Sequence, residues 1–273
     1  MQEVIKKRTS IRTYEQKSLS SSDQLIVKNI LEMFKDRVGP FGHKVRFFFI
    51  EDVGDYTHKI GTYGFIKHPQ AFIGGVVKNS KEGMIDFGFL MEQIILHLTK
   101  HNLGTVWLGG TYHREDFDVD LTNDEIIAAV SPVGYPKSKS IRERLIRGIS
   151  KGNQRKPFDE LFFSLNPSDH GGLMDQYHPY LKAIQLAPSA SNKQPWRVIL
   201  SNQTFHLYLK RTPQYGKGLK IDIQAIDIGI ALSHLYLTLL EDHDQVNIVK
   251  DDPKLKNEWE YILSVIIKNK ASK

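Results

Sequence analysis

The 273-residue sequence contains no cysteine. Disulfide bonds, thiolate metal sites and a cysteine nucleophile are therefore excluded. No apolar run reaches the roughly 18 residues that a membrane span requires, and the first residues, MQEVIKKRTSIRTY, lack the apolar region of a signal peptide. The sequence predicts a cytoplasmic protein that does not cross or bind a membrane.

Several ligand-binding patterns are also missing. Neither GxGxxG nor GxxxxGK[ST] occurs, so neither a Rossmann dinucleotide site nor a P-loop is indicated. No HExxH pattern or His/Asp cluster suggests a metal site. Most of the 11 histidines, such as His97 and His206, are expected to be packing or surface residues.

The net charge of +6 is not gathered in one segment. The basic residues are spread along the chain, and no compact basic stretch with interleaved aromatics forms a nucleic-acid module. Nucleic acid is therefore not expected as a partner. A local basic cluster that binds an anionic ligand remains compatible with this composition.

Apolar periodicity predicts a mixed α and β fold whose element order repeats. Asp86-Phe87-Gly88 lies near the start of one long apolar helix, and Asp227-Ile228-Gly229 lies near the start of another, 141 residues later. HKVRFFFI (43–50) and KQPWRVIL (193–200) are likewise 150 residues apart. Two matches in the same order indicate an internal duplication. The expected halves are residues 1–150 and 151–273, with a linker around 146–160. Helices are predicted over 20–37, 84–102, 178–189 and 221–243, and strands over 44–52, 68–77, 126–136, 195–201 and 204–211.

The N-terminal segment RTSIR carries a first candidate site. Arg8, Ser10 and Arg12 alternate, so in an extended segment their side chains share one face. Two guanidinium groups and a hydroxyl suit a phosphate. A solvated basic terminus is the alternative.

A second candidate, NLGTVWLGGTY (102–112), follows the first long helix. Its glycines allow a planar ligand to approach the backbone on either side of Trp107. The alternative is a glycine-rich turn with a core tryptophan.

The third candidate is LAPSASNKQPWRVIL (186–200). Ser189, Ser191, Asn192 and Gln194 supply donors and acceptors within six residues, and two prolines restrict the backbone. Such a set can bind the polar edge of a heterocycle. An Asx or Ser turn that closes a helix is the alternative.

Together with VGYP (133–136) and RKPFDEL (155–161), these segments resemble the FMN-dependent nitroreductase family. The resemblance is closest to a branch in which two nitroreductase-like halves share one chain. In the usual member the Pro-Ser-x-x-Asn-x-Gln-Pro-Trp motif follows soon after the Arg-Ser motif, whereas here it lies in the second half. This displacement fits an architecture in which both subunits of a dimer bind each flavin. The implied fold is α+β and nitroreductase-like: two similar halves, each with a mainly antiparallel sheet packed by helices, form a pseudo-dimer.

The resemblance also implies roles for individual residues. Arg8 and Ser10 would hold the FMN phosphate, together with Arg155 and its neighbour Lys156. Arg12 would reach the ribityl chain and the N1–C2=O side of the flavin. The other predicted cofactor-binding residues are Lys67 near flavin N1, Leu108 and Gly109 near N5 and O4, Trp107, and, from the other half, Pro188, Ser189, Ser191 and Asn192.

The implied activity is that of an FMN-dependent NAD(P)H oxidoreductase. Hydride would pass from transiently bound NAD(P)H through flavin N5 to an electron-poor acceptor, such as a nitroaromatic or a quinone, in a ping-pong reaction. No side chain is expected to act as catalytic acid or base; the Gly109 amide and Arg12 would tune the flavin. The alternative is a non-catalytic flavin-binding or carrier protein with one degenerate site. The expected oligomeric state is a monomeric pseudo-dimer or a weak homodimer, and loops 54–69 and 210–222 are expected to shape the pocket.

Overall fold

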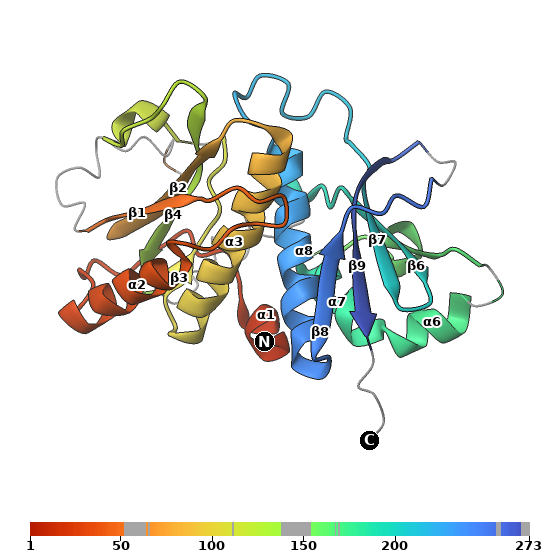
Figure 1. Cartoon of the computed structure of the whole chain (residues 1–273). Coiled ribbons are helices and arrows are strands. Elements are labelled where there is room, and N and C mark those ends of the chain that lie inside the picture. Colours follow the sequence, from red (N-terminus) through yellow and green to blue (C-terminus); the bar gives the residue numbers. More distant parts are fainter. Residues whose placement is uncertain are drawn as a thin grey trace.

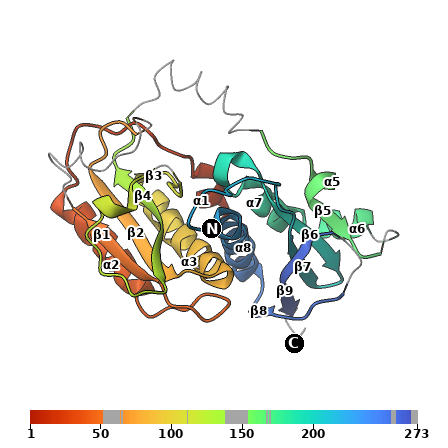
Figure 2. The ribbon, with the colours of Figure 1, turned by 90° about the horizontal axis from the view of Figure 1, so that it is seen from above.

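Two β-sheets flank a central pair of long helices in the computed structural model (Figure 1 and Figure 2). The structure describes residues 1–51, 64, 66–110, 112–137, 154–166, 168, 170–254 and 258–268. The first sheet has the order β1 (Arg46–Ile50), β2 (Ala71–Lys78), β4 (Glu125–Gly134) and β3 (Gly104–Thr105), with antiparallel pairs throughout. The second has the order β5 (Phe162–Ser164), β6 (Trp196–Ser201), β7 (Thr204–Leu209), β9 (Glu260–Lys268) and β8 (Gln245–Val249), and only its β5–β6 pair is parallel.

The helices complete a repeated order of elements. The described helices are α1 (Gln2–Lys7), α2 (Ser21–Phe34), α3 (Lys81–Lys100), α5 (Phe158–Leu161), α6 (His170–Gln176), α7 (His178–Leu186) and α8 (Ile223–Asp242). The run α2-β1-β2-α3-β3-β4 is followed by α7-β6-β7-α8-β8-β9, and both sheets use the same spatial order for the corresponding strands. The two halves therefore share one topology, to which the second half adds β5.

Side-chain caps fix where the main helices begin. Ser20 Oγ accepts from Asp23 N at 3.1 Å at the start of α2, and Ser80 Oγ accepts from Gly83 N at 3.0 Å at the start of α3. The Asp222 carboxylate accepts from Ala225 N in the same way at the start of α8. These bonds satisfy amides that have no partner within the helix.

Helices α3 and α8 cross at a pair of glycines related by the repeat. A methyl group on Gly88 would overlap the carbonyl oxygen of Ile226, and one on Gly229 would overlap the carbonyl oxygen of Ile85. Gly88 and Gly229 are 141 positions apart, and so are Ile85 and Ile226, so each half presents the same surface to the other. The Asp-x-Gly signatures thus mark the helix crossing of a pseudo-two-fold interface.

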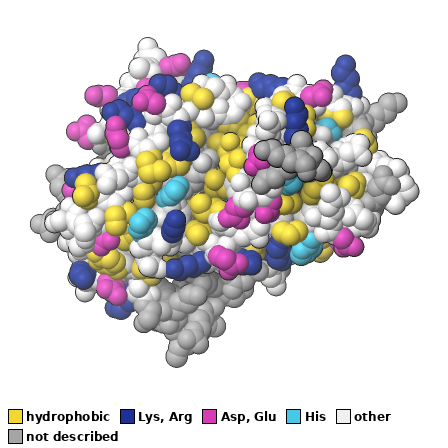
Figure 3. Space-filling model, turned by 60° about the horizontal axis from the view of Figure 1, so that its bottom comes forward, with side chains coloured by type: hydrophobic (Ala, Val, Ile, Leu, Met, Phe, Trp, Pro, Cys, Tyr) yellow, Lys and Arg dark blue, Asp and Glu magenta, His cyan; other side chains and the backbone are white. Residues whose placement is uncertain are grey.

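Helix α8 is long and apolar enough, by length and composition, to cross a membrane. Most of it is buried inside the protein, between α3, α7 and the second sheet. Its apolar character is explained by this position, because a helix that is apolar on all sides belongs in a core. On the face shown in Figure 3, basic and acidic side chains are intermixed, in line with the dispersed charge of the sequence.

The predicted helices and strands named above are confirmed within a few residues at their ends. The structure also contains elements that were not predicted from the sequence, namely α1, α5, α6 and the strands β3, β5, β8 and β9. Most of the expected linker and the expected boundary between residues 150 and 151 lie outside the described residues. His97 packs edge-on against Phe34, and His206 is buried in the second sheet beside Ser264, as expected for packing residues.

Candidate functional site

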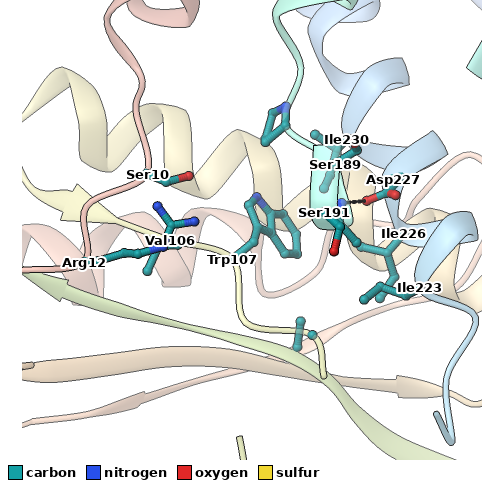
Figure 4. Close-up of a pocket in the computed structure, with 14 residues that line it drawn as sticks. Ser10, Arg12, Val106, Trp107, Ser189, Ser191, Ile223, Ile226, Asp227 and Ile230 are labelled. Carbon is teal, nitrogen blue, oxygen red and sulfur yellow. Dashed lines mark hydrogen bonds between the residues drawn. The ribbon is translucent and has the colours of Figure 1, made fainter. Parts of the chain in front are cut away.

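A cavity of about 140 Å³ lies between segments of the two halves. Figure 4 shows Ser10 and Arg12 on one side, Trp107 in the middle, and Ser189, Ser191 and Asp227 on the other. Seven of the thirteen predicted cofactor-binding residues line it, and they come from positions that are far apart in the sequence. The complete lining is Ser10, Arg12, Val106, Trp107, Gly109, Ala129, Pro188, Ser189, Ala190, Ser191, Ile223, Ile226, Asp227 and Ile230.

The N-terminal segment forms one wall because it pairs with two other segments. Ser10 makes a parallel β-bridge with Thr105 at the edge of the first sheet, and Lys67 N donates to Arg12 O at 2.8 Å. The segment is therefore extended here, and the side chains of Ser10 and Arg12 reach the same cavity, as the alternation predicts. Arg8 lies just after α1, with its side chain nearly buried and its Nε 3.8 Å from Glu92 Oε1.

The glycine-rich segment after α3 supplies the middle of the site. Trp107 is half-buried, packs edge-on against Phe87, and donates from its indole Nε1 to a buried carboxylate at 2.7 Å. Gly109 lines the cavity, and its carbonyl accepts from Arg114 Nη2 at 2.9 Å. The Leu108 side chain is buried, and its backbone N–H and C=O pair with Val130 of β4. Trp107 and Gly109 therefore lie at the cavity, while Leu108 holds this segment to the sheet.

The polar loop 188–194 forms the opposite wall in a strained conformation. Ser191, Asn192 and Gln194 have φ values of +46°, +56° and +48°, in the left-handed region that non-glycine residues adopt at a cost. Gln194 N donates to Ser189 Oγ at 2.9 Å, and Ser191 Oγ accepts from Tyr215 O–H at 2.9 Å. Internal and neighbouring hydrogen bonds therefore hold the serines at the cavity.

Asn192 points toward the segment that precedes α5. Its Oδ1 accepts from Arg155 Nη1 at 3.0 Å and its Nδ2 donates to Gln154 O at 2.7 Å. Burial and the proximity of the Arg8 guanidinium both lower the pKa of Arg155. The guanidinium groups of Arg8 and Arg155 thus lie close to each other beside the polar loop, although the two residues are almost 150 positions apart in the sequence. Such a pair of like charges is stabilised by an anion bound between them.

A buried carboxyl group that the sequence analysis did not select lines the cavity. Asp227 Oδ1 accepts from Ala190 N at 2.9 Å, but its Oδ2 is buried without a hydrogen-bond partner among the described residues. Desolvation by burial raises the pKa of Asp227 well above its ordinary value. The equivalent residue of the first half, Asp86, accepts from Phe41 N, His43 N and His43 Nδ1. In the first half, both oxygens of the aspartate at this position therefore accept hydrogen bonds. In the second half, only one oxygen of the equivalent aspartate does so, and this residue lies at the cavity.

The remaining predictions have mixed outcomes. The Lys67 side chain is exposed and does not line the cavity, although its backbone lies beside Arg12. No residue of loop 210–222 lines the cavity, but Tyr215 of this loop donates to the lining residue Ser191, and the loop surrounds a second, more open hollow that shares Ile223 with the first. Most of loop 54–69 lies outside the described residues. Within the described part of the chain, no group of three or more His, Cys, Asp and Glu side chains could hold a metal ion.

Residues that sequence reasoning missed come chiefly from the first turns of α8. Ile223, Ile226, Asp227 and Ile230 follow one face of this helix and line the cavity. Their i, i+3, i+4, i+7 spacing is the pattern of an apolar helix face, so from the sequence they are indistinguishable from core residues. The repeated Asp-x-Gly signature was the one available signal that this turn has a special position.

The chain is similar to proteins of the nitroreductase family. The family model described as "Putative TM nitroreductase" matches residues 1–239. A solved structure described as a putative nitroreductase from Thermotoga maritima has 20% sequence identity and a TM-score of 0.62, and the match covers 97% of this chain and 92% of that one. A nitroreductase family protein from Clostridium difficile has 20% identity over 59% of this chain and 95% of its own, with a TM-score of 0.42. An FMN-dependent nitroreductase from the same species has 16% identity over 51% of this chain and 90% of its own, with a TM-score of 0.39. No curated protein matches the sequence.

Proposed function

The chain belongs to the family described as "Putative TM nitroreductase", and on that premise we propose that it is an FMN-dependent NAD(P)H oxidoreductase. The acceptor would be an electron-poor molecule such as a nitroaromatic or a quinone, reduced in a ping-pong reaction. The observation that carries this proposal is the cavity itself. It unites Ser10, Arg12 and Gly109 of the first half with Ser189 and Ser191 of the second.

The groups at the site fit the chemistry of FMN. The close guanidinium groups of Arg8 and Arg155 match a phosphate dianion, and Ser10 adds a hydroxyl donor nearby. At the cavity, the Asp227 oxygen that has no protein partner offers a hydrogen-bond donor to a ring nitrogen or carbonyl group when the carboxyl group is protonated, as its raised pKa favours. These groups support the proposal, since they offer a cationic end to a phosphate and a polar, partly apolar pocket to a ring system.

In this proposal FMN supplies the hydride chemistry when bound. Arg8, Arg155 and Ser10 would hold its phosphate, and Pro188, Ser189 and Ser191 would orient its ring. Arg12, which lines the cavity with a fixed positive charge, would stabilise negative charge that develops on the ring. Trp107 and the isoleucines of α8 would restrict water at the ring, because they form the apolar part of the lining.

The reducing nucleotide would dock beside this cavity only transiently. The absence of a Rossmann motif is consistent with a nucleotide that enters and leaves during each cycle. The adjoining hollow is bordered by Lys217 and Lys220, which are exposed and can contact a phosphate group. We further propose that the protein acts in the cytoplasm as a monomer, since the interface between the two halves is already formed within one chain.

The proposal is tested by flavin binding and reduction. The purified protein, reconstituted with FMN where necessary, is expected to show oxidised-flavin absorbance that NADH or NADPH bleaches under anaerobic conditions. A nitroaromatic or quinone acceptor should then restore the absorbance. The variant R12A should slow or weaken these steps, whereas R37A, which removes an arginine that does not line the cavity, should not.

Two outcomes would limit or contradict the proposal. A protein that cannot be loaded with FMN contradicts it. A protein that binds FMN but is reduced by neither nucleotide would be a flavin-binding or carrier protein instead of an enzyme.

A further inference from the structure

The side chain of Arg114 is directed at backbone carbonyl groups beside the cavity. Its Nη2 donates to Gly109 O at 2.9 Å, its Nε donates to Ile127 O at 2.9 Å, and Nη2 also lies 3.5 Å from Ala128 O. The guanidinium group stacks on the Tyr112 ring, with 4.9 Å between its central carbon and the ring centroid. Gly109 lines the cavity, whereas Arg114 does not. One half-buried arginine therefore ties a residue of the cavity wall to strand β4 without itself reaching the cavity.

The two glycines of this segment are explained by close packing, and they leave its backbone free to rotate. A Cβ atom on Gly109 would lie 3.0 Å from Ile223 Cδ1, and one on Gly110 would lie 3.0 Å from Leu219 Cδ2. A side chain at either position would therefore press on residues of the second half. Two consecutive glycines, however, restrict the peptide between them less than other residues do. A separate contact is needed to fix the orientation of that peptide.

Hydrogen bonds fix both peptide groups that flank Gly109. The Leu108 carbonyl accepts from Val130 N at 3.0 Å, and the Gly109 carbonyl accepts from Arg114 Nη2. Because C=O and N–H point in opposite directions across a trans peptide, the N–H groups of Gly109 and Gly110 are turned away from these partners. Pairing with a strand thus holds the first peptide, and a side chain holds the second.

The second half repeats neither the glycine pair nor the arginine. By the 141-residue offset of the repeat, Gly109 and Gly110 correspond to Lys250 and Asp251, and the arginine corresponds to a leucine. The strands of the second half nevertheless pair in the same order as their counterparts in the first. The shared topology therefore does not require the glycine pair and its arginine, which points to a role at the cavity.

We propose that Arg114 is a positioning residue that keeps the Gly109 carbonyl turned from the cavity, so that this wall offers N–H donors to the polar edge of a bound ring. This inference rests on the proposed function and deepens it. Rotation of the peptide between Gly109 and Gly110 would replace a donor by a carbonyl oxygen. A flavin ring gains negative charge on reduction, which a backbone N–H stabilises and a carbonyl oxygen opposes. Arg114 therefore favours the reduced ring over the oxidised ring.

The balance between oxidised and reduced FMN tests the inference. R114A should lower the preference of the protein for reduced over oxidised FMN by about tenfold, which corresponds to a fall of about 30 mV in the two-electron midpoint potential. The Kd of oxidised FMN should change much less. The rate of flavin reduction at saturating nucleotide should also fall by about tenfold, while the KM for the nucleotide stays nearly unchanged.

R37A is the matched control for this substitution. Arg37 also donates to a backbone carbonyl, that of Met33, and stacks on the Phe34 ring, but it does not line or border the cavity. R114K keeps the charge but lacks the planar fork that reaches two carbonyl groups at once, so it should shift the potential in the same direction by a smaller amount. It carries the test if R114A does not fold. An unchanged potential in the Arg114 variants, or an equal shift in R37A, overturns the inference.

A second readout needs no flavin. In NMR spectra of the FMN-free protein, the amides of Gly109 and Gly110 should give one set of sharp signals in the wild type and in R37A. In R114A they should give two sets, or signals broadened by exchange, because the peptide then samples both orientations. One sharp set in R114A would overturn the inference. If the wild type cannot be loaded with FMN, the proposed function fails, and the NMR result alone decides the inference.

Discussion

The two aspartates of the repeated signature offer the sharpest test of how the halves differ. Asp86 and Asp227 occupy equivalent turns of α3 and α8, but Asp86 has three hydrogen-bond donors and Asp227 has one. The substitutions D86N and D227N make the same small chemical change at each. Their effects on the free energy of unfolding should nevertheless differ, because only D86N places an amide NH₂ group against existing donors.

The magnitudes follow from these contacts. Phe41 N is 2.8 Å from one Asp86 oxygen and His43 N is 2.9 Å from the other, so the asparagine NH₂ must face one of two fixed backbone N–H groups. A buried donor left without an acceptor costs about 1–3 kcal/mol, or roughly 2–10 °C in Tm for a chain of this size. In D227N the amide oxygen can still accept from Ala190 N, and the NH₂ group replaces an oxygen that has no partner. We expect its effect to stay within about 1 kcal/mol near pH 5.

The pH dependence provides an independent check. The raised pKa of Asp227 means that the folded protein retains a proton that the unfolded chain releases above about pH 4. The free energy of unfolding of the wild type therefore falls as the pH rises from about 4 toward the native pKa of Asp227. This contribution is absent in D227N, which should become more stable relative to the wild type as the pH rises.

Urea unfolding of the FMN-free proteins, followed by circular dichroism between about pH 4 and 8, measures both effects. The reasoning is refuted if D227N is destabilised as much as D86N. It is also refuted if the difference between D227N and the wild type does not change across this pH range.

Other substitutions test the cavity, the helix crossing and the hollow bordered by Lys217 and Lys220. W107F removes a hydrogen bond to a buried carboxylate and should raise the Kd of FMN about tenfold in a fluorescence titration; an unchanged Kd would separate this residue from the cofactor site. G88A and G229A each force a methyl group onto a backbone carbonyl and should each lower the free energy of unfolding in urea by about 1–3 kcal/mol; a tolerated alanine at either position would contradict the close crossing. K217A/K220A should raise the KM for NADPH severalfold in steady-state assays and leave that for NADH nearly unchanged; equal changes for both would argue against a phosphate contact in the hollow.

Much of the fold could be predicted from the sequence because the duplication repeats local signals. Asp86-x-Gly88 and Asp227-x-Gly229 recur because each half needs an aspartate that accepts from the loop before β1 or β6 and a glycine at the helix crossing. These requirements are local and fall at a fixed spacing, so they are visible in a single sequence. Strands β8 and β9, which correspond to β3 and β4 in the order of the sheets, were not predicted from the sequence.

The candidate site could be predicted only where residue type carried the signal. Ser10, Arg12 and Ser189 were selected because hydroxyls and guanidinium groups in short polar segments suggest ligand contacts, and all three line the cavity. Arg114 was not selected, because it lies in a polar stretch, YHREDFD (112–118), that carries no recognisable motif. Its contacts depend on how the segment after β3 folds back onto β4, which no local pattern contains.

The construction of the cavity from both halves of one chain has a consequence for dilute solutions. In a site shared by separate subunits, dissociation at low protein concentration removes one wall, so occupancy and activity per molecule fall together. Here Arg12 and Ser189 belong to the same chain. The effective concentration of one cavity wall at the other is therefore set by the covalent linkage and does not change when the protein is diluted. The specific activity should therefore stay constant as the protein is diluted, provided that free FMN is kept in excess.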